Sequence, residues 1–277
     1  MRKIKNQLDS SRIQEIFDTC NTFINEPMKS IIFKNKNIIL QESKNYNLYV
    51  PKMLDKYPLT NFAKAEIDEI KKLYTYKFSP KNSEGRIYYD LLLSNAGLSC
   101  PICGCATANT LDHFIPKTKY PQLCITPNNL IPVCSNCNEK KQIKYSNNYL
   151  EVPFHPYFEE MNEKWLECKI VFDVSKIYKY IFYCGNLTSK LVDKYKVHLD
   201  IYKLNDTFQG YCNSEIVSSN DRHRRLLDIS KEELIAFIKE TAKDNEKVDC
   251  NGWKAALYRG LERQIDDYCI YLKNRYN

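Results

Sequence analysis

The chain has 277 residues, of which 43% are hydrophobic and 27% are charged, a composition that fits one large globular domain or two modest ones. No apolar run reaches the roughly 18 residues of a membrane-spanning helix, and residues 1–25 lack the apolar core of a secretion signal. The net charge of +7 points toward a polyanionic partner such as a nucleic acid.

The cysteine content indicates the compartment. Twelve cysteines occur in a chain without a recognisable signal peptide, which is typical of a reducing environment. We therefore expect a cytoplasmic protein whose thiols are free or bound to metal, without disulfides.

Residues 1–97 are expected to form an N-terminal helical region. Two stretches carry apolar residues at helical spacing: the first contains Ile13, Ile16, Phe17, Cys20 and Ile24, and the second contains Ala63, Ile67, Ile70 and Tyr74. Between them, residues 31–58 are rich in Asn and Lys and predict a linker or an irregular, partly extended segment. A third helix is predicted over residues 83–95, with Gly97 just past its end.

The most informative stretch, residues 98–150, is bracketed by two C-x-x-C pairs. These are Cys100 with Cys103 and Cys134 with Cys137. Each pair lets two thiolates converge on one ion, and two pairs complete the tetrahedral sulfur shell of a structural zinc site. Cys105 and Cys124 also lie in this stretch and could replace a ligand, but the spacing favours the paired set.

Between and after the cysteine pairs, the pattern is strand, loop, strand, helix. Residues 111–115 alternate apolar and polar side chains, and residues 129–133 form a second short strand. Ser135 is a fair N-cap for a helix from about residue 136 to residue 144.

Asp112, His113 and Asn138 carry the chemistry of this stretch, because the predicted elements would bring them within reach of one point. A histidine placed beside a carboxylate and an amide oxygen can serve as the base for an attacking water while a bound cation neutralises developing negative charge. His113 can be that base only while neutral, so with an ordinary pKa near 6.5 activity is expected to fall below about pH 6. The alternative is a purely structural His–Asp pair.

Residues 151–277 are expected to form a mostly helical C-terminal region. Residues 165–184 alternate around a turn at 173–176 and predict a small β-hairpin. Ser230 with Glu233 predicts a capping box at the start of a helix. An apolar stripe follows, consisting of Trp253, Leu257, Leu261, Ile265, Tyr268 and Leu272, which is first a core-facing surface and second a dimer or partner interface.

Residues 154–158 are aromatic and include His155. We read them as a loop packed on the back of the central module, with a wall of the active site or DNA groove as the second reading.

Seven basic residues are candidate nucleic-acid contacts. They are Lys117, Lys119, Lys141 and Lys144 in the central stretch and Arg222, Arg224 and Arg225 in the C-terminal region. Lysines attract phosphate, and arginine forks fit it bidentately. For each of them the alternative is a solvated basic side chain.

The central stretch resembles the ββα-metal module of the HNH endonucleases, in the subgroup with a four-cysteine zinc. The matching residues are Asp112-His113, Asn129-Leu130 and the run C-x-x-C-N-x-x-K from Cys134 to Lys141. We therefore expect a mainly helical α+β protein with three regions, 1–97, 98–150 and 151–277. The second is the zinc-stapled nuclease module, and the third contains the β-hairpin.

The resemblance also implies a role for each matching residue. His113 would be the general base, Asp112 and Asn138 would hold a catalytic divalent cation, and Asn129 would fix the loop that orients the histidine. Asn138 replaces the second histidine of the family's name. An amide and a carboxylate oxygen suit Mg²⁺ or Mn²⁺ better than a soft metal.

The leading hypothesis is a metal-dependent endonuclease acting on DNA. Its rival is a zinc-dependent module that binds nucleic acid without cleaving it, although such a module has no need for Asp112, His113, Asn129 and Asn138 together. A third hypothesis keeps the nuclease but gives it RNA as substrate or makes it depend on a partner. Small HNH proteins resembling this one serve restriction or phage defence, some of them beside an ATPase, and no nucleotide-binding loop occurs in this chain.

Overall fold

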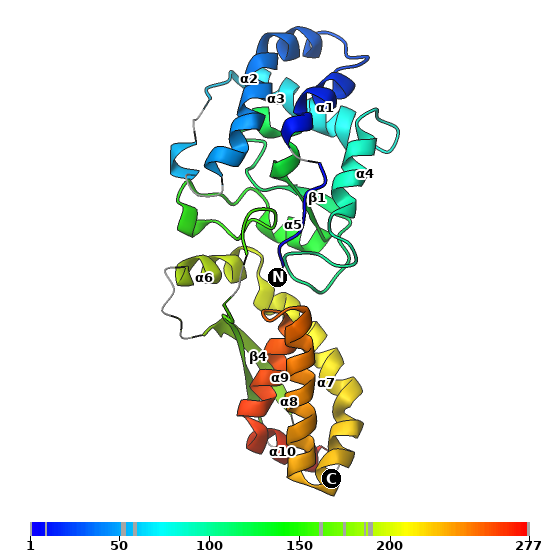
Figure 1. Cartoon of the computed structure of the whole chain (residues 1–277), viewed down its shortest axis with the longest axis vertical. Helices are drawn as coiled ribbons and strands as arrows, with labels where there is room; N and C mark the ends of the chain where they lie inside the picture. Colours follow the sequence, from blue (N-terminus) through cyan, green and yellow to red (C-terminus); the bar gives the residue numbers. More distant parts are fainter. Residues whose placement is uncertain are drawn as a thin grey trace. The chain divides into compact units, whose positions relative to one another are not determined.

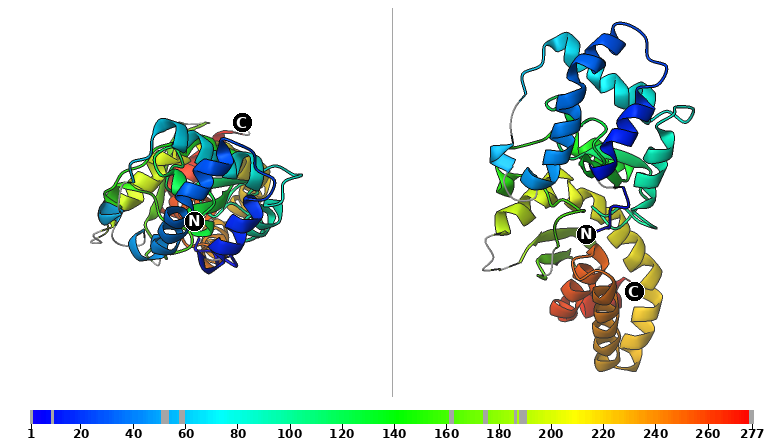
Figure 2. Two further views of the ribbon diagram at one scale, coloured as in Figure 1. Left: turned by 90° about the horizontal axis from the view of Figure 1, so that it is seen from above. Right: turned by 45° about the horizontal axis from the view of Figure 1, so that its top comes forward.

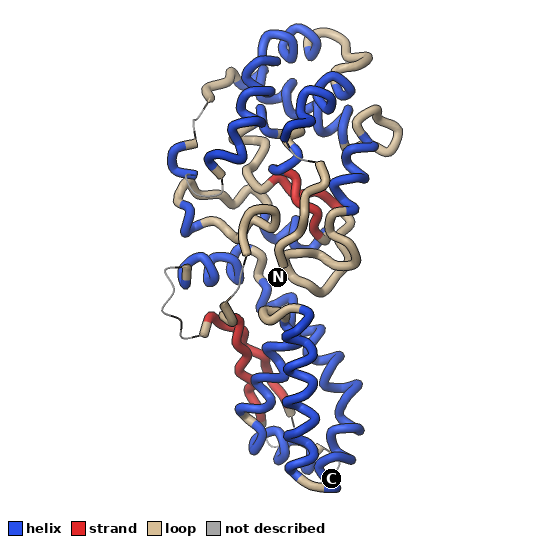
Figure 3. Tube along the Cα trace, in the orientation of Figure 1, coloured by secondary structure: helices blue, strands red, loops and turns tan. Residues whose placement is uncertain are grey.

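The computed structural model describes residues 2–8, 10–50, 54–57, 60–160, 163–173, 176–185, 187 and 191–275. Helices dominate these residues and their two small sheets are antiparallel, which confirms the expected mainly helical α+β fold (Figures 1 and 3). The chain divides into two compact units. The N-terminal unit is Lys3–Ile102 with Ala106–Glu160, and the C-terminal unit is Met161–Asn277 with Met1–Arg2 and Cys103–Cys105.

The N-terminal unit places helices around one small sheet. Its α-helices are α1 (Ile13–Cys20), α2 (Met28–Tyr49), α3 (Lys64–Lys72), α4 (Arg86–Ser94) and α5 (Ser135–Lys141), and the π-helical turn η3 (Leu73–Phe78) continues α3. Short 3-10 turns are η1 (Ser10–Arg12), η2 (Leu54–Lys56), η4 (Pro121–Leu123), η5 (Pro127–Asn129) and η6 (Tyr149–Glu151). The strands β1 (Thr110–His113) and β2 (Leu130–Val133) pair antiparallel, with Asp112 opposite Ile131 and His113 opposite Leu130.

Helix α2 occupies most of the segment predicted as a linker, so that prediction is wrong for residues 31–49. The polar composition conceals one apolar face, on which Ile32, Ile39, Leu40 and Tyr46 are buried. Burial of this face outweighs the weak helix propensity of the many asparagines. Residues 51–53 and 58 of the predicted linker lie outside the described residues.

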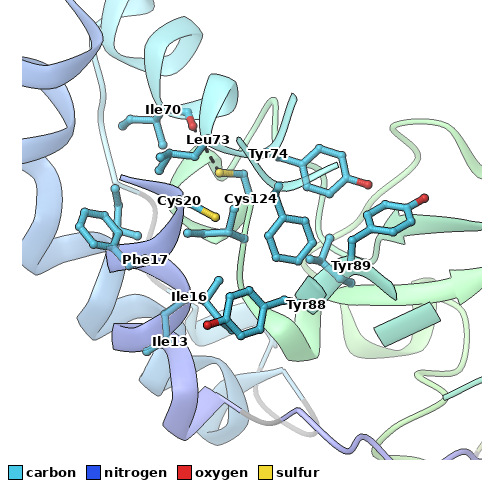
Figure 4. Close-up of a cluster of buried hydrophobic side chains, with 14 of the residues drawn as sticks. Ile13, Ile16, Phe17, Cys20, Ile70, Leu73, Tyr74, Tyr88, Tyr89 and Cys124 are labelled. Carbon is cyan, nitrogen blue, oxygen red and sulfur yellow. Dashed lines mark hydrogen bonds between the residues drawn. The ribbon is translucent and has the colours of Figure 1, made fainter. Parts of the chain in front are cut away.

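The core of the N-terminal unit joins the flanking helices to the central module (Figure 4). Apolar side chains of α1, α3, η3 and α4 meet Cys124 of the loop between β1 and β2. The Cys124 thiol donates to the Ile70 carbonyl at 3.4 Å, and burial raises the pKa of this thiol to about 12. Cys124 is therefore a core residue that ties the loop to α3.

The C-terminal unit contains the predicted hairpin and five helices among its described residues. The strands are β3 (Leu166–Phe172) and β4 (Ile177–Cys184), and the helices are α6 (Val192–Ile201), α7 (Leu204–Ile229), α8 (Lys231–Val248), α9 (Trp253–Arg263) and α10 (Ile265–Asn274). The antiparallel pairing of β3 with β4 confirms the hairpin, whose turn residues 174–175 lie outside the described part of the chain. Ser230 caps α8 as predicted, since its Oγ accepts from Glu233 N at 3.1 Å.

Helices α7 and α8 run side by side, and α9 packs on β3 (Figures 1 and 2). Gly260 permits the close approach of α9, because a Cβ at this position would lie 2.6 Å from the Cys168 carbonyl oxygen. The apolar stripe of the tail is divided between α9 and α10 and faces the core at Leu257, Leu261 and Tyr268. None of the described helices is long and apolar enough to cross a membrane.

Candidate active site

Four buried cysteine thiols form a cluster that could hold one metal ion. The ligand atoms of Cys100, Cys103, Cys134 and Cys137 all lie within 4.8 Å of one another. Cys105 and Cys124 do not join this cluster among the residues that the structure describes. Gly104, with a φ of +69°, allows the tight turn after the first pair. Four thiolates converging in this way fit a structural zinc ion.

Cys134 begins helix α5 as well as belonging to the cluster. Its backbone is extended and its Sγ accepts from Cys137 N, so Cys134 is the N-cap and the prediction of Ser135 is wrong by one residue. The Cys134 sulfur accepts the hydrogen bond that a serine oxygen usually accepts at an N-cap. The helix ends at Lys141 rather than at residue 144, because Gln142 has a φ of +50°.

His113 lies at the end of β1 and lines a cavity of about 500 Å³. Its Nε2 is 2.9 Å from the Cys124 carbonyl oxygen. Because a carbonyl oxygen can only accept, Nε2 carries the proton and Nδ1 remains the basic nitrogen. The Tyr74 ring packs edge-on against the imidazole, with ring centroids 4.4 Å apart. The structure therefore holds His113 in one tautomer and one orientation.

The pKa of His113 is lowered to about 3, chiefly by burial and also by the positive charge of Lys117. The imidazole therefore stays neutral far below pH 6, and the activity loss predicted from an ordinary histidine pKa does not fit this structure.

We expect any cleavage rate to change less than about twofold through His113 titration between about pH 8 and pH 5. Stability behaves differently: the unfolded chain protonates His113 near pH 6.5 while the folded chain does not, so the melting temperature should decrease as the pH falls below about 6.5. Paired pH series of rate and melting temperature would check this. A rate that falls with an apparent pKa near 6 would contradict it.

Asp112 is buried and forms an ion pair with Lys141. The Lys141 ammonium lies 2.9 Å from Asp112 Oδ2 and donates to the His113 carbonyl oxygen at 2.7 Å. Burial raises the pKa of Asp112, and the charge of Lys141 opposes this effect. Lys141 is 0% exposed, so its ammonium cannot reach a phosphate in an open groove, and the predicted phosphate contact does not fit this residue. Instead, Lys141 connects α5 to β1.

Asn129 is fully buried directly before β2 and bonds the loop between the strands. Its Oδ1 accepts from Ile115 N at 2.7 Å, and its Nδ2 donates to the carbonyls of Ile115 and Leu123 at 3.0 and 3.2 Å. Cys124, whose carbonyl holds His113, follows Leu123 directly. This geometry is the one that a loop-fixing role for Asn129 requires.

Asn138 lies in α5 and lines the cavity with Asp112 and His113. Its Nδ2 is 3.4 Å from Thr110 Oγ1, which directs the amide nitrogen toward β1. Lys141 engages Oδ2 of Asp112, and this carboxylate also accepts a backbone hydrogen bond from His113. Asp112 and Asn138 nevertheless bring a carboxylate and an amide oxygen to the same cavity. Carboxylate and amide oxygens fit a hard divalent ion such as Mg²⁺ or Mn²⁺.

Lys117 also lines the cavity, partly buried beside His113. Its Nζ lies 4.3 Å from the centre of the Tyr74 ring, and burial lowers its pKa. Tyr74, Ser79 and Tyr89 complete this wall from η3, the segment after it and α4. Sequence reasoning missed these three residues as parts of the site, because nothing in their local pattern distinguishes them from ordinary helix residues.

The remaining basic candidates are divided between the two units. Lys119 and Lys144 are exposed in the N-terminal unit, and the Lys119 ammonium lies 4.8 Å from the Tyr145 ring centre. The arginine cluster lies inside α7 of the C-terminal unit. Within that cluster, Arg224 Nη1 donates to the Leu272 carbonyl, whereas Arg222 and Arg225 are exposed.

Two antiparallel strands followed by a helix, with a cluster of four thiols beside them, form the arrangement of a ββα-metal domain. Residues 100–144 match the family model described as HNH endonuclease, and this part of the chain belongs to that family.

Two curated proteins illustrate the similarity. Protein ea31 of Escherichia phage lambda is 34% identical over 109 residues, which are 37% of this chain and 36% of that protein. Septu protein PtuB of Bacillus thuringiensis is 36% identical over 63 residues, or 21% of this chain and 24% of that protein. The chain thus covers about a third and a quarter of the length of these relatives. No solved structure matches it.

Proposed function

We propose that the chain is a metal-dependent endonuclease that hydrolyses phosphodiester bonds of DNA. The observation that carries the proposal is the orientation of His113. Its Nε2 is held by the Cys124 carbonyl, and its ring lines a cavity together with Asp112, Asn138 and Lys117. A neutral imidazole fixed in this way is suited to take a proton from water.

In the proposed reaction, His113 Nδ1 removes a proton from a water molecule in the cavity. The water oxygen then bonds to phosphorus as the bond from phosphorus to the leaving sugar oxygen breaks, and that oxygen takes a proton from solvent. Asn129 keeps the loop, and with it the imidazole, in place. Lys117 meets the negative charge of the phosphate.

Asp112 and Asn138 would hold the divalent cation through their side-chain oxygens. When bound there, Mg²⁺ or Mn²⁺ neutralises the charge that develops on the phosphate. The cysteine cluster would bind zinc and keep β1, β2 and α5 together, without taking part in the reaction.

The test is cleavage of supercoiled and linear DNA by the purified chain with Mg²⁺, Mn²⁺ or EDTA, beside a His113→Ala variant. We expect metal-dependent nicking or cutting that falls by about 10²- to 10⁴-fold in the variant, because that is the usual contribution of a general base. DNA binding and the circular dichroism spectrum should be unchanged, which would separate lost chemistry from lost fold. A variant rate within about tenfold of the parent would exclude His113 as the base.

If the parent protein does not cleave DNA, three alternatives can be tested. Cleavage of RNA under the same conditions would show that the substrate is RNA. Cleavage only after an ATPase partner and ATP are added would make the activity partner-dependent. Tight, salt-sensitive DNA binding without cleavage in any of these conditions would favour the non-cleaving binding module.

We infer a role in restriction or anti-phage defence, supported by the resemblance to small HNH proteins of such systems. Cells expressing the chain should plate phage less efficiently than cells expressing the His113→Ala variant. Equal plating across a broad phage panel would count against this role.

A further inference from the structure

A chain of buried hydrogen bonds connects His155 to the loop that orients His113. His155 is 1% exposed, and its Nδ1 accepts from Tyr157 N at 3.3 Å. An accepting Nδ1 leaves the proton on Nε2, which lies 3.1 Å from the Tyr46 hydroxyl. His155 therefore donates to Tyr46, and the aromatic segment packs in the interior, without lining the cavity beside His113.

Tyr46 connects His155 to the nuclease module through a second hydrogen bond. Its hydroxyl accepts a hydrogen bond from His155 Nε2 and donates one to Asn129 Oδ1 at 3.1 Å. Asn129 Nδ2 donates to the Leu123 carbonyl, and the next residue, Cys124, accepts from His113 Nε2. Each bond in this series fixes the donor and acceptor roles of the next group, so the pattern favours one set of rotamers and one tautomer of each histidine.

Tyr46 and His155 lie outside the motif of the module. Tyr46 comes from α2, 83 residues before Asn129, and His155 follows the module in the chain. The rings around His155 include Phe114 and Phe158, with centroids 4.3 and 4.4 Å away, and the imidazole is almost completely buried. Loss of one bond here would leave a buried donor and acceptor without compensation.

We propose that Tyr46 and His155 are positioning residues for the active-site histidine. They hold the amide of Asn129, and Asn129 holds the loop whose Cys124 carbonyl fixes His113. The expected effect on DNA cleavage rests on the proposed function, whereas the expected effect on the His113 hydrogen bond does not. The flanking regions then do more than surround the nuclease domain, because they complete the support of its base.

The first test compares Tyr46→Phe with Tyr57→Phe. The two tyrosines are buried in the same unit, but the Tyr57 hydroxyl donates to the Glu42 carbonyl in α2. Only the Tyr57 ring, which phenylalanine keeps, packs against Tyr120 of the loop. We expect Tyr46→Phe to lower kcat for DNA cleavage roughly tenfold with little change in KM, since a small misplacement of the base affects the chemical step. Tyr57→Phe should leave kcat near the parent value. Equal losses in both variants would overturn the proposal.

The second test does not depend on cleavage. Proton NMR of the protein labelled with ¹⁵N-histidine follows exchange of the His113 Nε2 proton with solvent. That proton should exchange at least about tenfold faster in Tyr46→Phe than in the parent or in Tyr57→Phe, because its acceptor carbonyl is held less firmly. Unchanged exchange would overturn the inference even if the chain cleaves DNA. Faster exchange in a chain that cleaves nothing would support the positioning role and count against the proposed function.

His155 offers a rescue experiment. His155→Gln keeps an amide that can donate to the Tyr46 hydroxyl, whereas His155→Phe removes the donor and keeps a ring of similar size. The glutamine variant should retain slower exchange of the His113 proton than the phenylalanine variant. The reverse order, with both variants folded, would show that ring packing and not the hydrogen bond matters.

Discussion

Replacing Cys134 by serine is expected to release the metal from the cysteine cluster and unfold the central module. A serine oxygen can still accept from Cys137 N, so the cap of α5 survives and the lost metal ligand is the main change. Structural zinc contributes on the order of 10 kcal/mol to the folding of small zinc domains, which is comparable to the whole stability of an ordinary domain. Zinc content by mass spectrometry and thermal melting would measure both effects.

Cys105→Ser is the matched control. Cys105 lies in the same turn but outside the four-thiol cluster, so its replacement should leave the zinc content and the melting temperature near those of the parent. Full zinc and an unchanged melting temperature in Cys134→Ser would show that the cluster is misassigned.

Replacing Lys141 by methionine is expected to lower the free energy of unfolding by about 3–5 kcal/mol, the usual effect of removing one partner of a buried ion pair. The variant keeps the length of the side chain but leaves the buried Asp112 carboxylate without its counter-charge. It also removes the donor to the His113 carbonyl oxygen, so cleavage should fall together with stability. Denaturant melts and cleavage rates would measure the two effects.

Two further variants make the Lys141 experiment specific. Adding Asp112→Asn to Lys141→Met removes the uncompensated charge and should restore part of the stability, but not the cleavage. Lys144→Met, at an exposed position just after the same helix, should leave stability unchanged and weaken DNA binding at all sequences alike. A Lys141→Met protein as stable as the parent would contradict the role derived from the ion pair.

Local patterns were sufficient for the parts of this protein that lie close together in the chain. The two C-x-x-C pairs predicted a four-thiol cluster, because metal ligands within one turn have little freedom in where they point. The alternation at residues 111–115 and 129–133 predicted the two strands, and the hairpin at 165–184 followed from the same period. These features depend on backbone geometry over a few residues.

Features that depend on burial could not be predicted in this way. The sequence shows Lys141 as one of several lysines near a cluster of polar residues, and only the packing of α5 on β1 makes it a buried partner of Asp112. The same holds for helix α2, whose asparagines and lysines predict an irregular segment until its apolar face meets the core. At these positions the degree of burial, more than the residue type, determined the structure and the partners of the side chains.

The sequence by itself determined which chemistry we propose for this chain, because the candidate residues for binding metal and moving a proton form a compact motif of known spacing. Only the tertiary structure decided how His113 is held, how far its pKa is lowered, and that Tyr46, Tyr74 and His155 support it. The physical reason is that orientation and desolvation come from contacts between residues far apart in the chain. Such contacts leave no periodic signal in the sequence.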